Sequence, residues 1–360
     1  MVTDHFSWVG TTRVMDLPTL EPTDAEASTR HAETEAPASA RARISAVTAR
    51  PQAATPPNSD ALPLELTFPV MSYRELEVRM DAQEQILWYF MKPQGAPSYT
   101  PALLAELSKL RGNIQKLCRR NPDAPPIRYL VNGSRLPHIF NLGGDLGLFA
   151  DHIRRRDREG LRRYAYDCID LVYTSSISFG LPILLISLVQ GDALGGGFEA
   201  ALASDVIIAE SSAKFGLPEI LFNLFPGMGA YSFLSRRLDP IRAERMILSG
   251  RIYTAAELHE MGLVDVVAED GEGEAAVRDY VARNTRRHAI QRTLREVGRR
   301  VHPIPYEELR DVTDLWVEAA MKLEDADLRR IDRLCGAQAR RLAASLASES
   351  STDPFATPSR

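Results

Sequence analysis

The segment 183–210 constrains the fold most strongly, because it places two strand patterns on either side of a glycine-rich turn and a helix. The run ILLISLVQ (183–190) is almost continuously apolar, which is typical of a strand in a sheet covered on both faces. GDALGGGFEAALASD (191–205) follows it, and DVIIAE (205–210) is the next strand pattern. Strand, helix and strand in this order predict an α/β fold with right-handed crossovers.

The flanking sequence extends this prediction in both directions from about Leu64. Hydrophobic periodicity indicates the following elements: strands at 76–80, 86–91 and 127–132, an amphipathic helix at 103–117, a glycine loop at 140–149, helices through most of 150–178, and a mostly helical segment at 240–342 with one short strand near LVDVVAE.

The two ends of the chain differ from the rest in composition. Residues 1–62 are rich in Ala, Thr, Pro, Ser and Glu and poor in aromatic residues, so we expect a disordered extension. The same reasoning predicts a disordered tail at 344–360. Between them we expect an α/β core at 63–270 and a C-terminal helical region at 271–343.

Composition excludes several classes of function. The net charge of -5 gives no basic field for nucleic acid. The three cysteines are far apart and no metal-ligand motif is present, so we expect free thiols, no metal and no cofactor. No apolar run approaches the ~20 residues of a membrane span, and the first residues lack the pattern of a secretion signal. These observations predict a cytoplasmic protein.

Two glycine loops are candidates for binding an oxyanion. In each, LGGD (142–145) and GGG (195–197), glycines follow a strand pattern and a helical pattern comes next. The first N–H groups of a helix have no acceptor within the helix, and they suit an oxygen that gains negative charge during a reaction. A tight turn that needs glycine for steric reasons explains either loop equally well.

Two glutamates lie close to these loops in the sequence. Glu199 comes two residues after the three glycines, and Glu219 stands in the apolar segment FGLPEILFNLFPGMGA (215–230). Glu219 is therefore either at an exposed tip or in an apolar pocket, where burial would raise its pKa. A pair of carboxyl groups in different surroundings can act as general acid and general base.

Together these segments, followed by ERMILSGRIYTAAELHEMGLVDVV (244–267), resemble the crotonase (enoyl-CoA hydratase/isomerase) superfamily. The segments FNLGGDL and FNLFPGMGAYSFLSRR resemble one branch more closely, the bacterial diffusible signal factor synthases. The resemblance implies a ββα spiral core. It also implies that a 3-hydroxyacyl chain on acyl carrier protein is dehydrated and its thioester hydrolysed, releasing a cis-2-unsaturated fatty acid used as a quorum-sensing signal.

The resemblance assigns roles to eight residues. It implies that Glu199 and Glu219 are the catalytic carboxyl groups and that Gly144 and Gly196 supply the oxyanion hole. It further implies an acyl pocket lined by Leu194, Met228, Trp316 and Leu334, although ordinary core packing would also explain these side chains. Phe198 and other bulky neighbours of the glutamates argue against short crotonyl-type substrates.

The sequence also suggests binding partners and leaves alternative functions open. An acidic acyl carrier protein or the phosphates of CoA could dock on arginines 154–163 or 286–300, unless local acidic residues neutralise them. The resemblance implies a homo-oligomer, often a trimer, and a membrane sensor kinase as a partner. Two alternative functions stay open: a CoA-dependent enoyl-CoA hydratase or isomerase of fatty-acid metabolism, and a protein that acts by binding a sensor or carrier.

Overall fold

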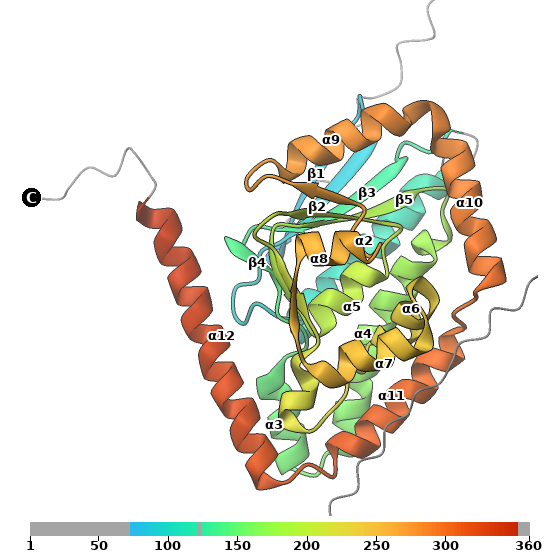
Figure 1. The fold of residues 1–360 in the computed structure, drawn as a ribbon. Coiled ribbons are helices and arrows are strands. Elements are labelled where there is room, and N and C mark those ends of the chain that lie inside the picture. The colour runs from blue at the N-terminus through green and yellow to red at the C-terminus, as the bar shows by residue number, and fades with distance from the viewer. Residues whose placement is uncertain (1–72, 121–123, 352–360) are drawn as a thin grey trace, which may run out of the picture. The chain divides into compact units, whose positions relative to one another are not determined.

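The computed structural model describes residues 73–120 and 124–351, and side chains up to Ala347. The predicted disordered extension lies outside this range. Ten strands form two sheets within the described chain. Figure 1 shows the arrangement of these elements and of the helices around them.

The larger sheet has the strand order β1-β2-β3-β5-β7-β10. Its members are β1 (Leu76–Asp81), β2 (Ile86–Met91), β3 (Tyr129–Ser134), β5 (Leu184–Val189), β7 (Val206–Glu210) and β10 (Val266–Ala268). β1 and β2 pair antiparallel, and all other pairs in this sheet are parallel.

Both faces of the larger sheet are covered, as the apolar strand patterns predict. Along β2, Ile86, Trp88 and Phe90 pack with Val277 and Val281 of α9 (Gly273–Asn284). The alternate residues of the same strand face a second cluster, to which α2 (Pro101–Arg120), α4 (Arg158–Ser176) and α5 (Gly196–Leu202) contribute. The side-chain alternation of a strand therefore divides the core into two layers.

The smaller sheet has the order β4-β6-β8-β9. Its strands are β4 (His138–Asn141), β6 (Gly191–Leu194), β8 (Lys214–Gly216) and β9 (Ile252–Thr254). In three successive units a strand of the larger sheet is followed by a strand of the smaller sheet and then by a helical segment: β3, β4 and α3 (Leu146–Arg154); β5, β6 and α5; β7, β8 and η2 (Pro218–Phe222). This is the expected ββα spiral.

The remaining helical segments lie between α4 and β5 or after η2. They are η1 (Ser178–Gly180), α6 (Ala230–Arg237), α7 (Pro240–Ser249), α8 (Ala255–Glu260), η3 (Thr285–Arg287), α10 (His288–Val301), α11 (Tyr306–Ala320) and α12 (Asp325–Ser351).

Three expectations about the elements and their boundaries are wrong. The segment 191–194 is the separate strand β6 rather than part of the turn before the glycines, and β9 was not expected. The tail expected from residue 344 is also wrong up to Ser351, because α12 continues to that residue. Ser345 is buried and donates from its hydroxyl to the carbonyl of Pro137 at 2.5 Å, so this part of the helix is held against the segment before β4.

Candidate active site

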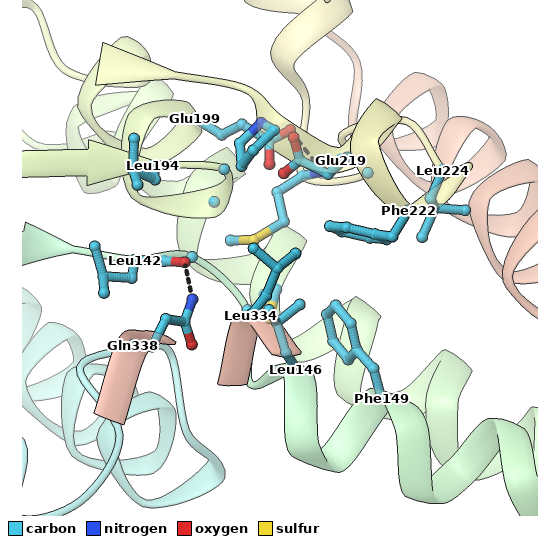
Figure 2. A pocket seen from close by; sticks show the side chains of 18 of the residues that line it. Leu142, Leu146, Phe149, Leu194, Glu199, Glu219, Phe222, Leu224, Leu334 and Gln338 are labelled. Atoms are coloured by element: carbon cyan, nitrogen blue, oxygen red, sulfur yellow. Dashed lines mark hydrogen bonds between the residues drawn. The ribbon is translucent and has the colours of Figure 1, made fainter. Parts of the chain in front are cut away.

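One cavity of about 320 Å³ brings together all eight residues to which the sequence analysis gave a role. Figure 2 labels Leu194, Glu199, Glu219 and Leu334 among the residues that line it. The eight are Gly144, Leu194, Gly196, Glu199, Glu219, Met228, Trp316 and Leu334. They come from segments that are far apart in the sequence, and the spiral brings them to one place. The volume is within the range of about 300–1,000 Å³ that is typical of small-molecule sites.

The two glycine loops touch each other at the cavity. Gly143 has φ +94° and Gly195 has φ +51°, conformations that favour glycine. A Cβ on Gly143 would lie 2.9 Å from the backbone nitrogen of Gly196, and a Cβ on Gly196 would lie 3.4 Å from Cα of Gly143. Side chains here would push the loops apart, so glycine is required for their close approach.

The N–H groups of Gly144 in one loop and Gly196 in the other have no acceptor among the described residues. Gly196 is the first residue of α5, where N–H groups have no acceptor within the helix. In the other loop the N–H of Gly143 donates to Oδ1 of Asn141 at 2.8 Å, and the N–H of Asp145 donates to the hydroxyl of Tyr164 at 2.9 Å. These bonds hold the loop on both sides of Gly144.

Glu199 is 1% exposed and is held by backbone donors. Its Oε1 accepts hydrogen bonds from the N–H groups of Met228 at 2.8 Å and of Ala230 at 2.9 Å. Ala230 is the first residue of α6, so the positive end of that helix also faces the carboxylate. Burial raises the pKa of Glu199, and the bonds from Ala230 and Met228 oppose this rise.

Glu219 has a different environment from Glu199. Its Oε2 is buried and has no hydrogen-bond partner within the described chain, and a Cβ on Gly195 would lie 2.5 Å from its Oε1. Burial, and then the negative charge of Glu199, raise the pKa of Glu219. Figure 2 shows the two carboxyl groups beside each other at one side of the cavity.

The pair is therefore asymmetric. Two donors stabilise the ionised form of Glu199, whereas nothing comparable stabilises an ionised Glu219. Near neutral pH the arrangement favours one proton on the pair, located on Glu219. Such a pair can accept a proton on one carboxyl group and donate one from the other.

The structure also adds cavity residues that the sequence did not single out. They are Leu142, Gly143, Leu146, Phe149, Tyr164, Ala165, Cys168, Gly195, Pro218, Phe222, Leu224, Gly227, Ala337, Gln338 and Arg341. Most are apolar or aromatic, and helical periodicity cannot separate such residues from ordinary core. Gln338 and Arg341 lie on α12, where Gln338 donates to the carbonyl of Leu142 at 3.3 Å and Arg341 pairs with Asp192 at 2.5 Å.

One sequence argument about the site is wrong. Phe198 does not line the cavity; it is fully buried and stacks edge-to-face on Phe215, with ring centroids 5.3 Å apart. Helix α5 directs this side chain into the core, so its bulk says nothing about the size of the substrate.

Acidic residues pair with several arginines of the segment 154–163. Arg154 pairs with Asp332 at 2.7 Å, Arg162 pairs with Glu159 at 2.5 Å, and Arg158 pairs with Glu318. This is the neutralised arrangement that the sequence left open as an alternative to docking.

The described residues hold neither a metal-binding cluster nor a membrane-spanning helix. Residues 73–120 and 124–351 contain no group of three or more His, Cys, Asp or Glu side chains arranged to hold a metal ion. None of the helices in the same ranges is long and apolar enough to span a bilayer.

The fold and the site define a spiral α/β protein with two glutamates paired in one cavity. Comparison with known proteins identifies the family to which this protein belongs. The enoyl-CoA hydratase/isomerase family matches residues 114–297, more than half of the chain, so this chain belongs to that family. The predicted membership of the crotonase superfamily is thereby confirmed.

Curated relatives are similar to only part of this chain. A probable enoyl-CoA hydratase of Mycobacterium leprae is 43% identical over 183 residues, which cover 50% of this chain and 64% of that protein. The methylglutaconyl-CoA hydratase of Mus musculus is 32% identical over 176 residues, covering 47% and 53%. The matched part spans only 34% to 64% of the first relatives' own lengths.

Solved structures support the same fold. DspI of Pseudomonas aeruginosa is 26% identical with a TM-score of 0.53, covering 68% of this chain and 91% of that one. The human mitochondrial delta3-delta2-enoyl-CoA isomerase has a TM-score of 0.60 at 18% identity, covering 74% and 99%. At that identity the isomerase supports the fold alone.

Proposed function

We propose that this chain is a crotonase-type enzyme that dehydrates a 3-hydroxyacyl thioester and then hydrolyses it, releasing a cis-2-unsaturated fatty acid. The observation that carries the proposal is the meeting of two glutamates with two unoccupied glycine N–H groups in one apolar cavity. The cis geometry, the acyl carrier protein and the signalling role of the product derive from the resemblance to the signal synthases. A cytoplasmic location derives from the sequence.

Dehydration begins with the thioester carbonyl on the N–H groups of Gly144 and Gly196. These donors stabilise the negative charge that forms on the oxygen when the proton on C2 is removed. Removing one such donor in other enzymes costs about 2.7–4 kcal/mol of barrier. The loop contacts that fix Gly143 and Asp145 keep the donor between them in place.

The two glutamates move the protons. The ionised carboxylate, Glu199, takes the proton from C2, and the electron pair of that bond enters the enolate. The enolate then forms the double bond between C2 and C3 as the C3–O bond breaks. The departing hydroxide takes the proton of Glu219 and leaves as water. The pair ends with one proton, as it began.

Hydrolysis uses the same cavity in a second step. A water molecule that loses a proton to a carboxylate attacks the thioester carbonyl, and the oxyanion again lies on the two glycine N–H groups. The carbon–sulfur bond breaks, the thiol leaves with a proton, and the free acid remains. No other nucleophile of the described cavity competes for this role, because burial raises the pKa of the Cys168 thiol and keeps it protonated.

A second candidate function is a CoA-dependent hydratase or isomerase, and the names of the curated relatives favour it. Both functions need the same two glutamates and the same oxyanion hole. They differ in the carrier and in whether free acid is released. A purely binding role is a third candidate, and a double variant Glu199→Gln, Glu219→Gln that kept all cellular function would support it.

The experiment is a product analysis with purified protein. The 3-hydroxydodecanoyl thioester is supplied on acyl carrier protein and separately on CoA, and mass spectrometry identifies the products. We expect free cis-2-dodecenoic acid from the carrier-protein substrate, and none with Glu199→Ala or Glu219→Ala. A reversible trans-2-enoyl-CoA without free acid would replace this proposal by the hydratase. No turnover of either thioester would overturn both.

A further inference from the structure

The cavity opens to solvent at α12. Among the described residues that line the cavity, only Ala337 and Arg341 are exposed, and both belong to this helix. The other lining residues are buried or half-buried. In Figure 1, α12 forms one edge of the described chain. A substrate attached to a large carrier therefore reaches the glutamates past this helix.

Four arginines lie on the side of α12 that carries this opening. They are Arg330, Arg333, Arg340 and Arg341, and all four are exposed. Arg333 precedes Ala337 by four residues and Arg340 follows it by three, spacings that place side chains on one side of a helix. Arg330 lies two turns before Ala337 and Arg341 one turn after it, so the four form one arginine row along the opening.

Acidic residues neutralise only part of the arginine row. Arg330 and Arg341 each pair with an aspartate, at 3.0 Å and 2.5 Å. Arg333 and Arg340 have no ion pair within the described chain. Asp332 is the one acidic residue between positions 328 and 347, and it pairs with an arginine of α3. The side of α12 beside the opening therefore keeps a positive field.

Polar contacts fix α12 to the core of the protein. Gln338 donates to the carbonyl of Leu142 at 3.3 Å, and Ser345 donates to the carbonyl of Pro137 at 2.5 Å. The ion pair of Arg341 lies between these two contacts along the helix. The arginine row thus has a fixed position relative to the cavity, which lowers the entropic cost of binding a partner there.

We propose that the arginine row docks an acidic carrier protein and so presents its acyl thioester to the cavity. This inference rests on the proposed function for the reaction and for the substrate. Acyl carrier proteins are acidic, and a row of cations beside the opening attracts and orients such a partner. The arm that carries the thioester then enters beside Ala337, between Arg333 and Arg340.

The test compares two thioesters of the 3-hydroxydodecanoyl group. One is on acyl carrier protein, and the other is on N-acetylcysteamine, which brings neither a protein nor a phosphate. We expect the double variant Arg333→Glu, Arg340→Glu to raise KM for the carrier-protein substrate about tenfold or more, with little change in kcat. Its kcat/KM for the N-acetylcysteamine thioester should stay unchanged. Equal losses with both substrates would overturn the inference.

Ionic strength and CoA distinguish a protein-docking surface from a phosphate site. Added salt should lower the wild-type kcat/KM for the carrier-protein substrate and have little effect on the double variant. CoA carries phosphates but no acidic protein surface. An equal loss with the CoA thioester and with the carrier-protein substrate would assign the arginines to phosphate and overturn protein docking.

Arg286 and Arg287 on η3 provide a matched control. Both are exposed, neither lines the cavity, and they belong to the segment 286–300 on which the sequence also allowed a carrier to dock. Replacing both by glutamate changes the net charge by the same amount as the double variant on α12. We expect KM for the carrier-protein substrate to stay unchanged. A rise as large as that of the α12 variant would show that net charge, rather than the arginine row, attracts the carrier.

Binding separates this inference from the proposed reaction. Calorimetry measures the affinity for acyl carrier protein whose 3-hydroxyacyl group is attached through an amide, which is not hydrolysed. Weaker binding by the Arg333→Glu, Arg340→Glu variant, in a protein that turns over no thioester, would support the docking surface and reject the reaction. Equal affinity of wild type and variant would reject the docking surface, whatever the turnover.

Discussion

Replacing Glu219 by glutamine is predicted to stabilise the folded protein while abolishing turnover. Burial and the charge of Glu199 raise the pKa of Glu219 from 4.5 to about 8. In the unfolded chain the carboxyl group ionises near its ordinary pKa, so between these two values the folded protein binds more protons. The stability of the wild type therefore falls as pH rises through this window.

The magnitude follows from the width of the window. Each pH unit between 4.5 and about 8 lowers the free energy of unfolding by about 1.4 kcal/mol, which sums to roughly 4 kcal/mol at the upper end. Glutamine does not ionise, so the variant escapes this loss. The benefit should be near zero close to about pH 4.5 and largest at about pH 8 and above.

Urea unfolding of wild type and Glu219→Gln across this pH range measures the difference directly. Glu260→Gln is the control for the substitution itself, because Glu260 is exposed at the end of α8 and lies outside the cavity. Parallel stability curves for wild type and Glu219→Gln would refute the reasoning, since they would mean that the carboxyl group titrates equally in both states.

Three further predictions follow from the same geometry. Tyr164→Phe should lower kcat by up to about tenfold with little change in KM, because the N–H of Asp145 loses its acceptor beside the oxyanion loop; steady-state kinetics would show the split. Gly197→Ala should lower the free energy of unfolding by about 1–3 kcal/mol, since its Cβ would lie 2.1 Å from the carbonyl oxygen of Asn141. Gly112→Ala in α2 is the control measured by the same urea unfolding; its Cβ meets no atom within 4 Å, so it should stabilise the protein by up to about 1 kcal/mol. The pH profile of kcat/KM should be bell-shaped, because one of the two glutamates must be ionised and the other protonated. Its maximum should lie between about pH 7 and about pH 8, since these are the pKa values to which burial raises Glu199 and Glu219, and a flat profile from about pH 5 to about pH 9 would contradict this.

Much of the core could be predicted from the sequence because its periodicity is strong. The strand at 86–91 and the helix at 103–117 appear in the structure as β2 and α2 with small shifts of their ends. Strand β6 was missed because it follows β5 after a single residue and its four residues, GDAL, carry no apolar strand pattern. Gly191 allows it to lie against β4, since a Cβ there would be 2.0 Å from the backbone carbon of His138, and only the tertiary structure shows that contact.

The site was less accessible to sequence reasoning than the core. The two glutamates and both glycine loops carry local patterns, and the structure brings them to one cavity. Gln338 and Arg341 have no such pattern, because their place at the cavity depends on the position of α12, which no local rule predicts. Phe198 shows the opposite error: its neighbours in the sequence line the cavity, whereas its side chain points into the core.

The most direct test of the account is the structure of the Glu219→Gln variant with a bound 3-hydroxydodecanoyl thioester. The account predicts the thioester oxygen about 2.7–3.1 Å from the backbone nitrogens of Gly144 and Gly196, with C2 and C3 facing residues 199 and 219. A thioester oxygen bound elsewhere, with these two N–H groups still unoccupied, would contradict it.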